Sequence, residues 1–218
     1  MSTSAEEFVA QLRMLNAAVR TANLDELDTH ELLTAARDLT ALIDTANVDE
    51  PRMQAALVMS ELLSRVGDAE GRRARMRENG ISDMFPYSPY AGPLNPISPP
   101  VTMSLQPGEP YDEVHSRTVF EATYNGPPQS VHGGVIAGVF DELLGSVCVV
   151  NDVAGFTGTL TVKYRSPTPL GEPIDMRSWV DRVEGRKTFA RGTFYSGETL
   201  LAEAEGIFIQ TIEFAPIG

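Results

Sequence analysis

A loop that ends in two glycines could bind an anion in this sequence. The loop runs from Asn125 to His132 and leads through Gly133 and Gly134 into an apolar segment. If that segment is a helix, its first backbone N–H groups have no partner within the helix and lie at the positive end of its dipole. Such N–H groups would stabilise an oxyanion that develops during a reaction.

An acidic pair interrupts the apolar segment. Asp141 lies nine residues after His132, and Glu142 follows it. A carboxylate can act as a general base or as a nucleophile at neutral pH. Because consecutive helical residues are rotated by about 100°, Glu142 points away from Asp141 and is predicted to be a surface or interface carboxylate.

Other familiar active-site motifs are absent from the sequence. It has no G-x-S-x-G motif, no glycine-rich phosphate loop and no H-E-x-x-H metal motif. Its three histidines, His30, His115 and His132, fall in three different predicted elements. The single cysteine, Cys148, continues the apolar stripe and is predicted to pack in the core. We expect neither a metal site nor a bound cofactor.

The composition is that of a globular protein. The chain has 218 residues, of which 42% are hydrophobic and 22% charged, and its net charge is −13. This charge makes nucleic acids and anionic membranes poor partners. The N-terminal residues lack the basic and apolar regions of a secretory signal, and no stretch has the ~18 uncharged apolar residues of a membrane span. We expect a cytoplasmic protein.

The elements that must position the loop and Asp141 fall into three parts. Residues 1–79 carry three amphipathic patterns and are predicted to form a helical N-terminal module. Residues 80–100 contain six prolines and are predicted to be a linker. Because this linker also contains aromatic and apolar residues, we expect it to lie packed along a surface. Residues 101–218 are predicted to form the domain that carries the site.

The domain at 101–218 is predicted to be of the α+β class. Residues 133–150 carry a wide apolar stripe that predicts a deeply buried helix. Strands are predicted over residues 113–123, 155–165, 172–184, 187–196 and 199–210. The expected layering is one long helix covered by one curved antiparallel sheet.

On these features the sequence resembles the hot-dog-fold acyl-CoA thioesterases of the phenylacetyl-CoA thioesterase (PaaI-like) family. The resemblance rests on His132-Gly133-Gly134, the Asp141 spacing, the segment from Thr157 to Tyr164-Arg165-Ser166-Pro167, and the hairpin at 183–187. It covers about residues 100–212. It implies the hot-dog fold, preceded by the helical extension, and an enzyme that hydrolyses an acyl-CoA thioester to a free acid and CoA.

The resemblance also implies roles for four residues. The Gly133 N–H would polarise the thioester carbonyl, and His132 would shape the loop. Asp141 would activate water or attack the carbonyl directly, and Thr157 would hold the water. One donor aimed at an oxyanion is worth ~3 kcal/mol in comparable cases.

Substrate contacts are expected around these four residues. Gly134 and Asn125 are candidate contacts, although relatives often have an asparagine six residues before the histidine, where this sequence has Gly126. The best local basic patch for the CoA phosphates consists of Arg165, Arg182, Arg186 and Lys187.

The spacing along the helix predicts a site shared between two subunits. Gly133 and Asp141 are eight residues apart, or about 12 Å along one helix at 1.5 Å per residue. A reacting atom must lie about 3 Å from both donor and nucleophile. We therefore expect a homodimer, or a dimer of dimers, in which Asp141 of one subunit lies beside Gly133 of the other, as the resemblance also implies.

Two other functions remain open from the sequence. One is an enoyl-CoA hydratase on the same fold, although Asp141 is followed five residues later by Ser146 and not by a histidine. The other is a non-catalytic acyl-CoA-binding or regulatory hot-dog protein with the N-terminal helices as its partner surface. A binder gains little from a carboxylate beside an anionic ligand, so Asp141 favours catalysis.

Overall fold

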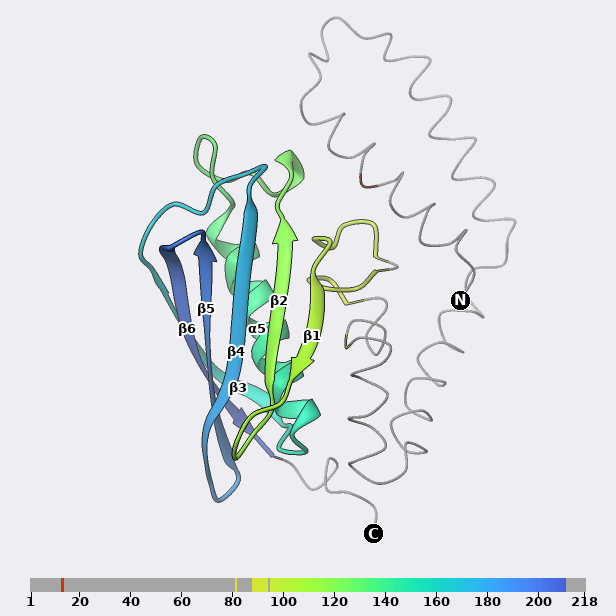
Figure 1. Ribbon diagram of the computed structural model, residues 1–218, viewed down its shortest axis with the longest axis vertical. Coiled ribbons are helices and arrows are strands. Elements are labelled where there is room, and N and C mark those ends of the chain that lie inside the picture. Colours follow the sequence, from red (N-terminus) through yellow and green to blue (C-terminus); the bar gives the residue numbers. More distant parts are fainter. Residues whose placement is uncertain (1–12, 14–80, 82–87, 94, 211–218) are drawn as a thin grey trace, which may run out of the picture.

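The structure is a computed structural model that describes Arg13, Ile81, residues 88–93 and residues 95–210 (Figure 1). The predicted module at residues 1–79 lies outside the described residues except for Arg13, and so does part of the predicted linker. The domain that was expected to carry the site is described from residue 101 to residue 210.

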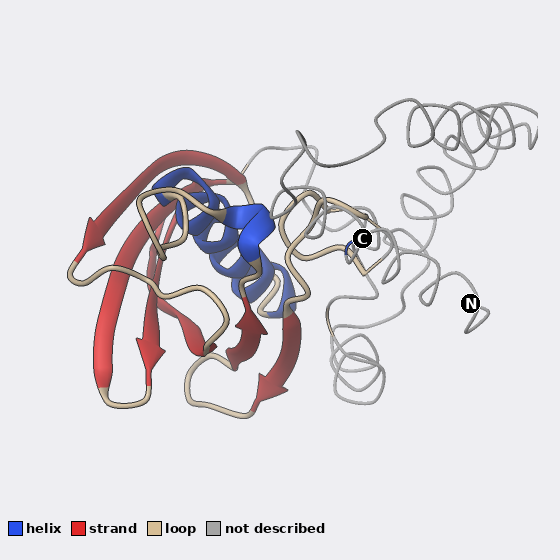
Figure 2. Cartoon of the chain, turned by 90° about the horizontal axis from the view of Figure 1, so that it is seen from above, coloured by secondary structure: helices blue, strands red, loops and turns tan. Residues whose placement is uncertain are grey.

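The helix α5, Gly133–Val150, has the bounds that the apolar stripe predicts. Nine of its 18 residues are buried, namely Ile136, Val139, Phe140, Leu143, Leu144, Ser146, Val147, Cys148 and Val150. The core position of Cys148 is confirmed, and burial raises the pKa of its thiol to about 12. With a mean hydropathy of 1.7, α5 is by length and composition apolar enough to cross a membrane. In the structure it lies inside the curve of the sheet (Figure 2).

One antiparallel sheet of six strands curves around α5 (Figures 1 and 2). Its strands, in spatial order, are β1 (Thr102–Gln106), β2 (Glu113–Val119), β4 (Pro173–Glu184), β5 (Lys187–Ser196), β6 (Thr199–Ile209) and β3 (Phe156–Tyr164). A long helix wrapped by such a sheet confirms the predicted hot-dog architecture.

The structure differs from the sequence prediction at two places in the sheet. The predicted strand at 113–123 ends at Val119, and residues 122–124 form the 3₁₀ turn η3 (Ala122–Tyr124). The edge strand β1 was not predicted, because it has only five residues and prolines lie close to both of its ends. Its pairing with β2 is a tertiary contact that a five-residue pattern does not specify.

The centre of the core is a stacked aromatic pair. Phe140 of α5 and Phe194 of β5 are both fully buried, and their ring centroids lie 4.0 Å apart. This contact between helix and sheet holds α5 in one rotation about its axis. It therefore determines which helix residues face the sheet and which face away from it.

We predict that Phe140→Ala lowers the free energy of unfolding by about 3–5 kcal/mol, because it removes a buried ring and leaves a cavity. Urea denaturation followed by circular dichroism measures this loss. Ile97→Ala is the control, because Ile97 is 62% exposed and a surface truncation of this kind changes stability by about 0.5 kcal/mol or less. Losses of similar size in both variants would contradict the prediction.

Candidate active site

The first turn of α5 leaves one backbone donor free. His132 is the N-cap of the helix, and its Nδ1 accepts a hydrogen bond from the Gly134 N–H at 3.0 Å. The His132 carbonyl accepts from the N–H groups of Val135 and Ile136. The Gly133 N–H makes no hydrogen bond with any described residue, so it is available to an acceptor from outside.

Tyr164 at the end of β3 holds the same turn from the side. Its hydroxyl donates to the Gly133 carbonyl oxygen at 2.8 Å. The peptide group between Gly133 and Gly134 is thereby bonded at both ends, through its oxygen to Tyr164 and through its N–H to His132. Two such bonds hold the start of the helix in one orientation.

The loop before α5 requires glycine at residue 126. A Cβ on Gly126 would lie 2.6 Å from the Cα of His132, closer than real side chains approach. The loop is closed by hydrogen bonds from the Gly126 N–H to the Ser130 carbonyl and from the His132 N–H to the Tyr124 carbonyl, both at 2.8 Å. An asparagine at this residue would therefore not fit without a shift of the loop. Asn125 is exposed, and its side chain donates to the Gly126 carbonyl at 3.2 Å.

Asp141 and Thr157 form the second part of the site. Asp141 is half-buried on α5, and its Oδ1 accepts a hydrogen bond from the Thr157 hydroxyl at 2.9 Å. Thr157 is exposed near the start of β3, where the pairing with β6 shifts by one residue at Gly158. A Cβ on Gly158 would lie 2.9 Å from the Ile209 side chain, so glycine allows this bulge.

The structure therefore assembles the predicted catalytic residues into two groups. His132, Gly133 and Gly134 lie together at the start of α5, and Asp141 lies with Thr157 about 12 Å further along the helix. Within one chain the donor and the carboxylate do not reach a common point. The edge strand β3 contacts α5 at both groups, through Tyr164 and Thr157.

Glu142 is neither a free surface carboxylate nor part of the Asp141–Thr157 pair. It is half-buried and forms a side-chain hydrogen bond with Ser88, which precedes β1 in the predicted linker. Burial raises the pKa of Glu142, the hydrogen bond with Ser88 opposes this rise, and the charge of Asp141 adds to it. At this contact Ser88 of the predicted linker lies against α5.

Two of the four cations of the predicted basic patch form ion pairs within the chain, and two form none with a described residue. Arg165 forms an ion pair with Glu203, and Arg182 bonds Asp181 and Glu184. The side chains of Arg186 and Lys187, at the turn between β4 and β5, are exposed and form no ion pair or hydrogen bond with a described residue.

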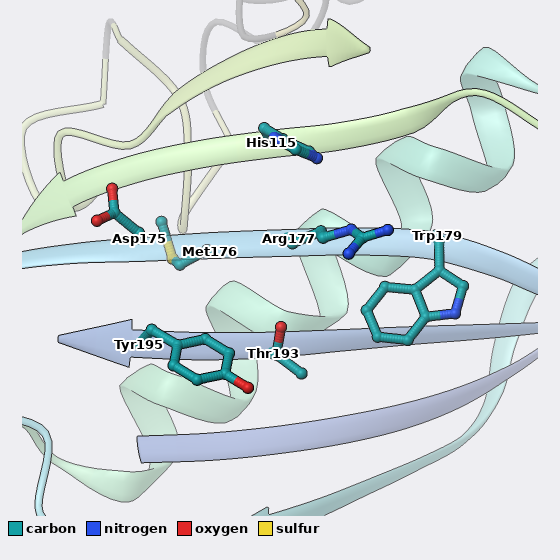
Figure 3. Close-up of a pocket in the computed structure, with 7 residues that line it drawn as sticks. All are labelled: His115, Asp175, Met176, Arg177, Trp179, Thr193 and Tyr195. Atoms are coloured by element: carbon teal, nitrogen blue, oxygen red, sulfur yellow. The ribbon is translucent and has the colours of Figure 1, made fainter. Parts of the chain in front are cut away.

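A cavity of about 330 Å³ lies on the outer face of the sheet (Figure 3). Its lining residues are His115, Asp175, Met176, Arg177, Trp179, Thr193 and Tyr195. Arg177 bonds Glu113 and lies 5.3 Å from the ring of Trp179, and the Nε2 of His115 lies 3.0 Å from Glu113. The neighbouring Ser178 faces inward and bonds α5. The cavity is thus on the side of the sheet away from Asp141. Its ionic side chains are paired with residues outside the lining, His115 and Arg177 with Glu113 and Asp175 with Arg117.

Sequence reasoning assigned no role to Tyr164, Ser88 or Tyr90, all three of which contact the site helix. Tyr164 stands in the quoted motif Tyr164-Arg165-Ser166-Pro167, so a signal existed, but its hydrogen bond to Gly133 spans 31 residues. Ser88 and Tyr90 carried no signal beyond the apolar content of the linker.

Comparisons with known proteins agree with this architecture. Residues 129–203 match the family model described as Thioesterase superfamily. A Mus musculus protein named acyl-coenzyme A thioesterase THEM4 is 35% identical over 106 residues, which are 46% of this chain and 46% of that protein. A Xenopus laevis protein of the same name is 38% identical over 87 residues, 39% of each chain. The chain thus spans less than half the length of these curated relatives.

Solved structures resemble this chain as well. The crystal structure of a thioesterase superfamily protein matches with a TM-score of 0.70 and 25% identity, and the match covers 95% of this chain and 96% of that chain. A zebra fish thioesterase superfamily member 2 matches with a TM-score of 0.51 and 16% identity over 61% of this chain and 97% of that chain, which shows the fold alone.

We predict that Glu142→Gln makes the protein more stable at pH 7 and leaves it unchanged in acid. A raised pKa in the folded state means that burial favours the protonated carboxyl. The resulting stability is present below the unfolded pKa of ~4.3 and is lost as the pH rises through the folded pKa. Glutamine is neutral throughout and keeps an oxygen that accepts from Ser88.

Thermal melting from pH 3.5 to pH 7 tests this prediction. The difference in midpoint between the variant and the wild type is expected to grow as the pH rises above ~4 and to vanish below it. Glu198→Gln, on the exposed turn between β5 and β6, is the matched control. Equal midpoints for Glu142→Gln and wild type at pH 7 would show that the buried charge of Glu142 does not destabilise the folded protein.

Proposed function

We propose that this chain, whose residues 129–203 match the family model described as Thioesterase superfamily, hydrolyses acyl-CoA thioesters to a free acid and CoA. The observation that carries the proposal is a free N–H donor at the start of α5 combined with a carboxylate, held by Thr157, on the same helix. The names of the curated relatives support the same reaction and substrate class.

The Gly133 N–H is proposed to bind the carbonyl oxygen of the thioester. As water or Asp141 attacks the carbonyl carbon, this oxygen becomes an oxyanion, which the N–H and the positive end of the α5 dipole stabilise. His132 and Tyr164 hold the turn before substrate arrives, so little reorganisation is needed during the reaction. One such donor is worth about 3 kcal/mol in comparable enzymes.

Asp141 is proposed to supply the nucleophile. As a general base it removes a proton from water, which then attacks the carbonyl carbon; as a nucleophile it forms an acyl-enzyme anhydride that water hydrolyses. In both routes the C–S bond breaks and CoA leaves as the thiolate. The Thr157 hydroxyl donates to Oδ1 of Asp141, which orients the carboxylate and leaves the hydroxyl oxygen free to accept a bond from the attacking water.

The site is proposed to form between two copies of the chain. The strand β3 is an edge of the sheet, and Phe156 and Tyr164 on it are 56% and 53% exposed. An edge strand with exposed aromatic side chains is normally paired or covered. A second copy paired along β3 would bring its own α5 alongside, and a two-fold axis there would place one Gly133 beside the other chain's Asp141.

Arg186 and Lys187 are proposed to contact the CoA phosphates. Lys187 pairs with Ile209 of β6, which pairs in turn with Phe156 of β3. At about 4.8 Å between neighbouring strands, the turn lies about 10 Å from the start of β3, where Thr157 holds Asp141. Arg165 is a weaker candidate because it already pairs with Glu203.

A cytoplasmic location is proposed as well, since the one cysteine of the chain is a buried thiol.

We predict that Asp141→Asn lowers kcat at least about 100-fold and leaves acyl-CoA binding intact, because asparagine is neither a base nor a nucleophile but still accepts the bond from Thr157. Thiol release from an acyl-CoA panel measures kcat, and calorimetry measures binding. Asp175→Asn, on the outer face of the sheet, is the control. If Asp141→Asn keeps more than about a tenth of the wild-type kcat, a difference of ~1.4 kcal/mol, the assigned role is wrong.

We also predict that two inactive variants restore activity when they are mixed. Gly133→Pro removes the donor N–H, and the helix tolerates it because proline suits the first helical position and His132 already has the extended φ and ψ of −63° and 131° that precede proline. A Cβ at Gly133 meets Tyr164 at no less than 3.4 Å.

Gly133→Pro and Asp141→Ala chains are unfolded and refolded together. With random pairing, half of the dimers are mixed and one of their two sites is intact, so roughly a quarter of the wild-type activity is expected. Each variant refolded alone is the baseline. Mixed dimers that form, as shown by tagged chains, and yet stay inactive would place the whole site within one chain.

A further inference from the structure

The ring of Tyr90 lies directly on α5, one turn before Asp141. A Cβ built on Gly138 would fall 2.2–2.6 Å from three carbon atoms of the Tyr90 ring. No other residue type leaves room for the ring at this point. Gly138 precedes Asp141 by three residues, or about 4.5 Å along the helix axis. The ring therefore borders the space in front of the carboxylate.

Two further contacts hold the segment that carries Tyr90, which consists of residues 88–93 and Asn95 (the 88–95 segment). Ser88 forms a hydrogen bond with Glu142 and accepts from the N–H groups of Tyr90 and Ala91 at 3.2 Å. The Arg13 guanidinium donates to the carbonyl oxygens of Gly92 at 2.9 Å and Asn95 at 3.0 Å. The segment is thus fixed at both of its ends.

The 88–95 segment and β3 lie on opposite sides of Asp141. Around the helix, Gly138 and Glu142 are rotated from Asp141 by about 60° and 100° in one sense, and both contact this segment. Gly133, which contacts Tyr164 of β3, is rotated by about 80° in the other sense. A substrate whose carbonyl lies at Asp141 is therefore bordered by β3 on one side and by Tyr90 on the other.

Charge distinguishes the two sides. Arg186 and Lys187, whose side chains pair with no described residue, lie at the turn two strands from the start of β3. The phosphates of CoA are therefore expected on the β3 side. The sequence from 88 to 95 contains no charged residue, and the neighbouring carboxylates Asp141 and Glu142 would repel phosphates. The Tyr90 side suits the uncharged end of the substrate.

We propose that the 88–95 segment, held by Arg13, forms a wall of the acyl-binding site, and that Tyr90 limits the size of the acyl group that the site accepts. This inference rests on the proposed thioesterase function. It makes the region before the hot-dog domain part of substrate selection, because Arg13 holds the segment from a position 79 residues before Gly92.

Tyr90→Ala and Tyr90→Leu test the proposal through the kcat/KM of acetyl-, hexanoyl-, decanoyl-, palmitoyl- and phenylacetyl-CoA. Because one methylene in an apolar pocket changes discrimination about 10- to 200-fold, we expect Tyr90→Ala to raise kcat/KM for the longest acyl groups relative to acetyl-CoA by at least about tenfold. Tyr90→Leu is expected to shift the profile in the same direction by less. Arg13→Met, which keeps an apolar stem without the donors, is expected to shift it similarly. Tyr195→Ala, in the outer-face cavity, is the control.

The contact itself is tested without activity by a double-mutant cycle in urea. Gly138→Ala is expected to destabilise the wild type but not Tyr90→Ala, because in that variant the new Cβ finds room and alanine favours the helix. Equal destabilisation in both backgrounds, or an acyl profile in Tyr90→Ala and Tyr90→Leu that matches wild type, would overturn the proposal and leave the proposed function standing. An Arg13→Met profile identical to wild type would remove Arg13 from it. No turnover of any acyl-CoA by the wild type would overturn the proposed function, and this inference with it.

Discussion

Burial of α5 against the concave face of the sheet is the constraint on which the geometry of the site depends. The stacked pair of Phe140 and Phe194 lies at the centre of this contact, and half of the helix residues are buried. A helix held in this way cannot bend to bring Gly133 toward Asp141. The distance of about 12 Å between them is therefore a fixed property of the chain, and it is the reason that a second subunit enters the proposed mechanism.

The edge strand β3 connects the two groups of the site. At one end its Tyr164 bonds the carbonyl of Gly133, and near the other its Thr157 bonds Asp141. A movement of β3 relative to the helix would change the donor and the carboxylate together. Pairing of β3 with a second copy would thus complete the site and hold it at the same time, which relates the proposed oligomer to the chemistry.

The sequence by itself determined the elements with long or regular hydrophobic patterns. A segment of 18 residues with a wide apolar stripe at helical spacing predicts a buried helix, and the bounds of α5 were predicted to the residue. The strands at 155–165, 172–184, 187–196 and 199–210 were predicted within about a residue, because alternation of period two and glycine turns specify them locally. The α+β layering followed from these elements, whereas the hot-dog fold and the candidate residues His132, Gly133, Asp141 and Thr157 followed from the family resemblance.

Only the tertiary structure decided which residues contact the site from far along the chain. Tyr164 reaches Gly133, Tyr90 rests on Gly138 and Arg13 bonds Gly92, yet none of these pairs shares a local pattern. The short edge strand β1 escaped prediction for the same reason, since its stability comes from pairing with β2. Hydrophobic periodicity indicates which face of an element is buried, but it does not indicate which segment packs against that face. That packing depends on close approaches between distant segments, and these exist only once the chain has folded.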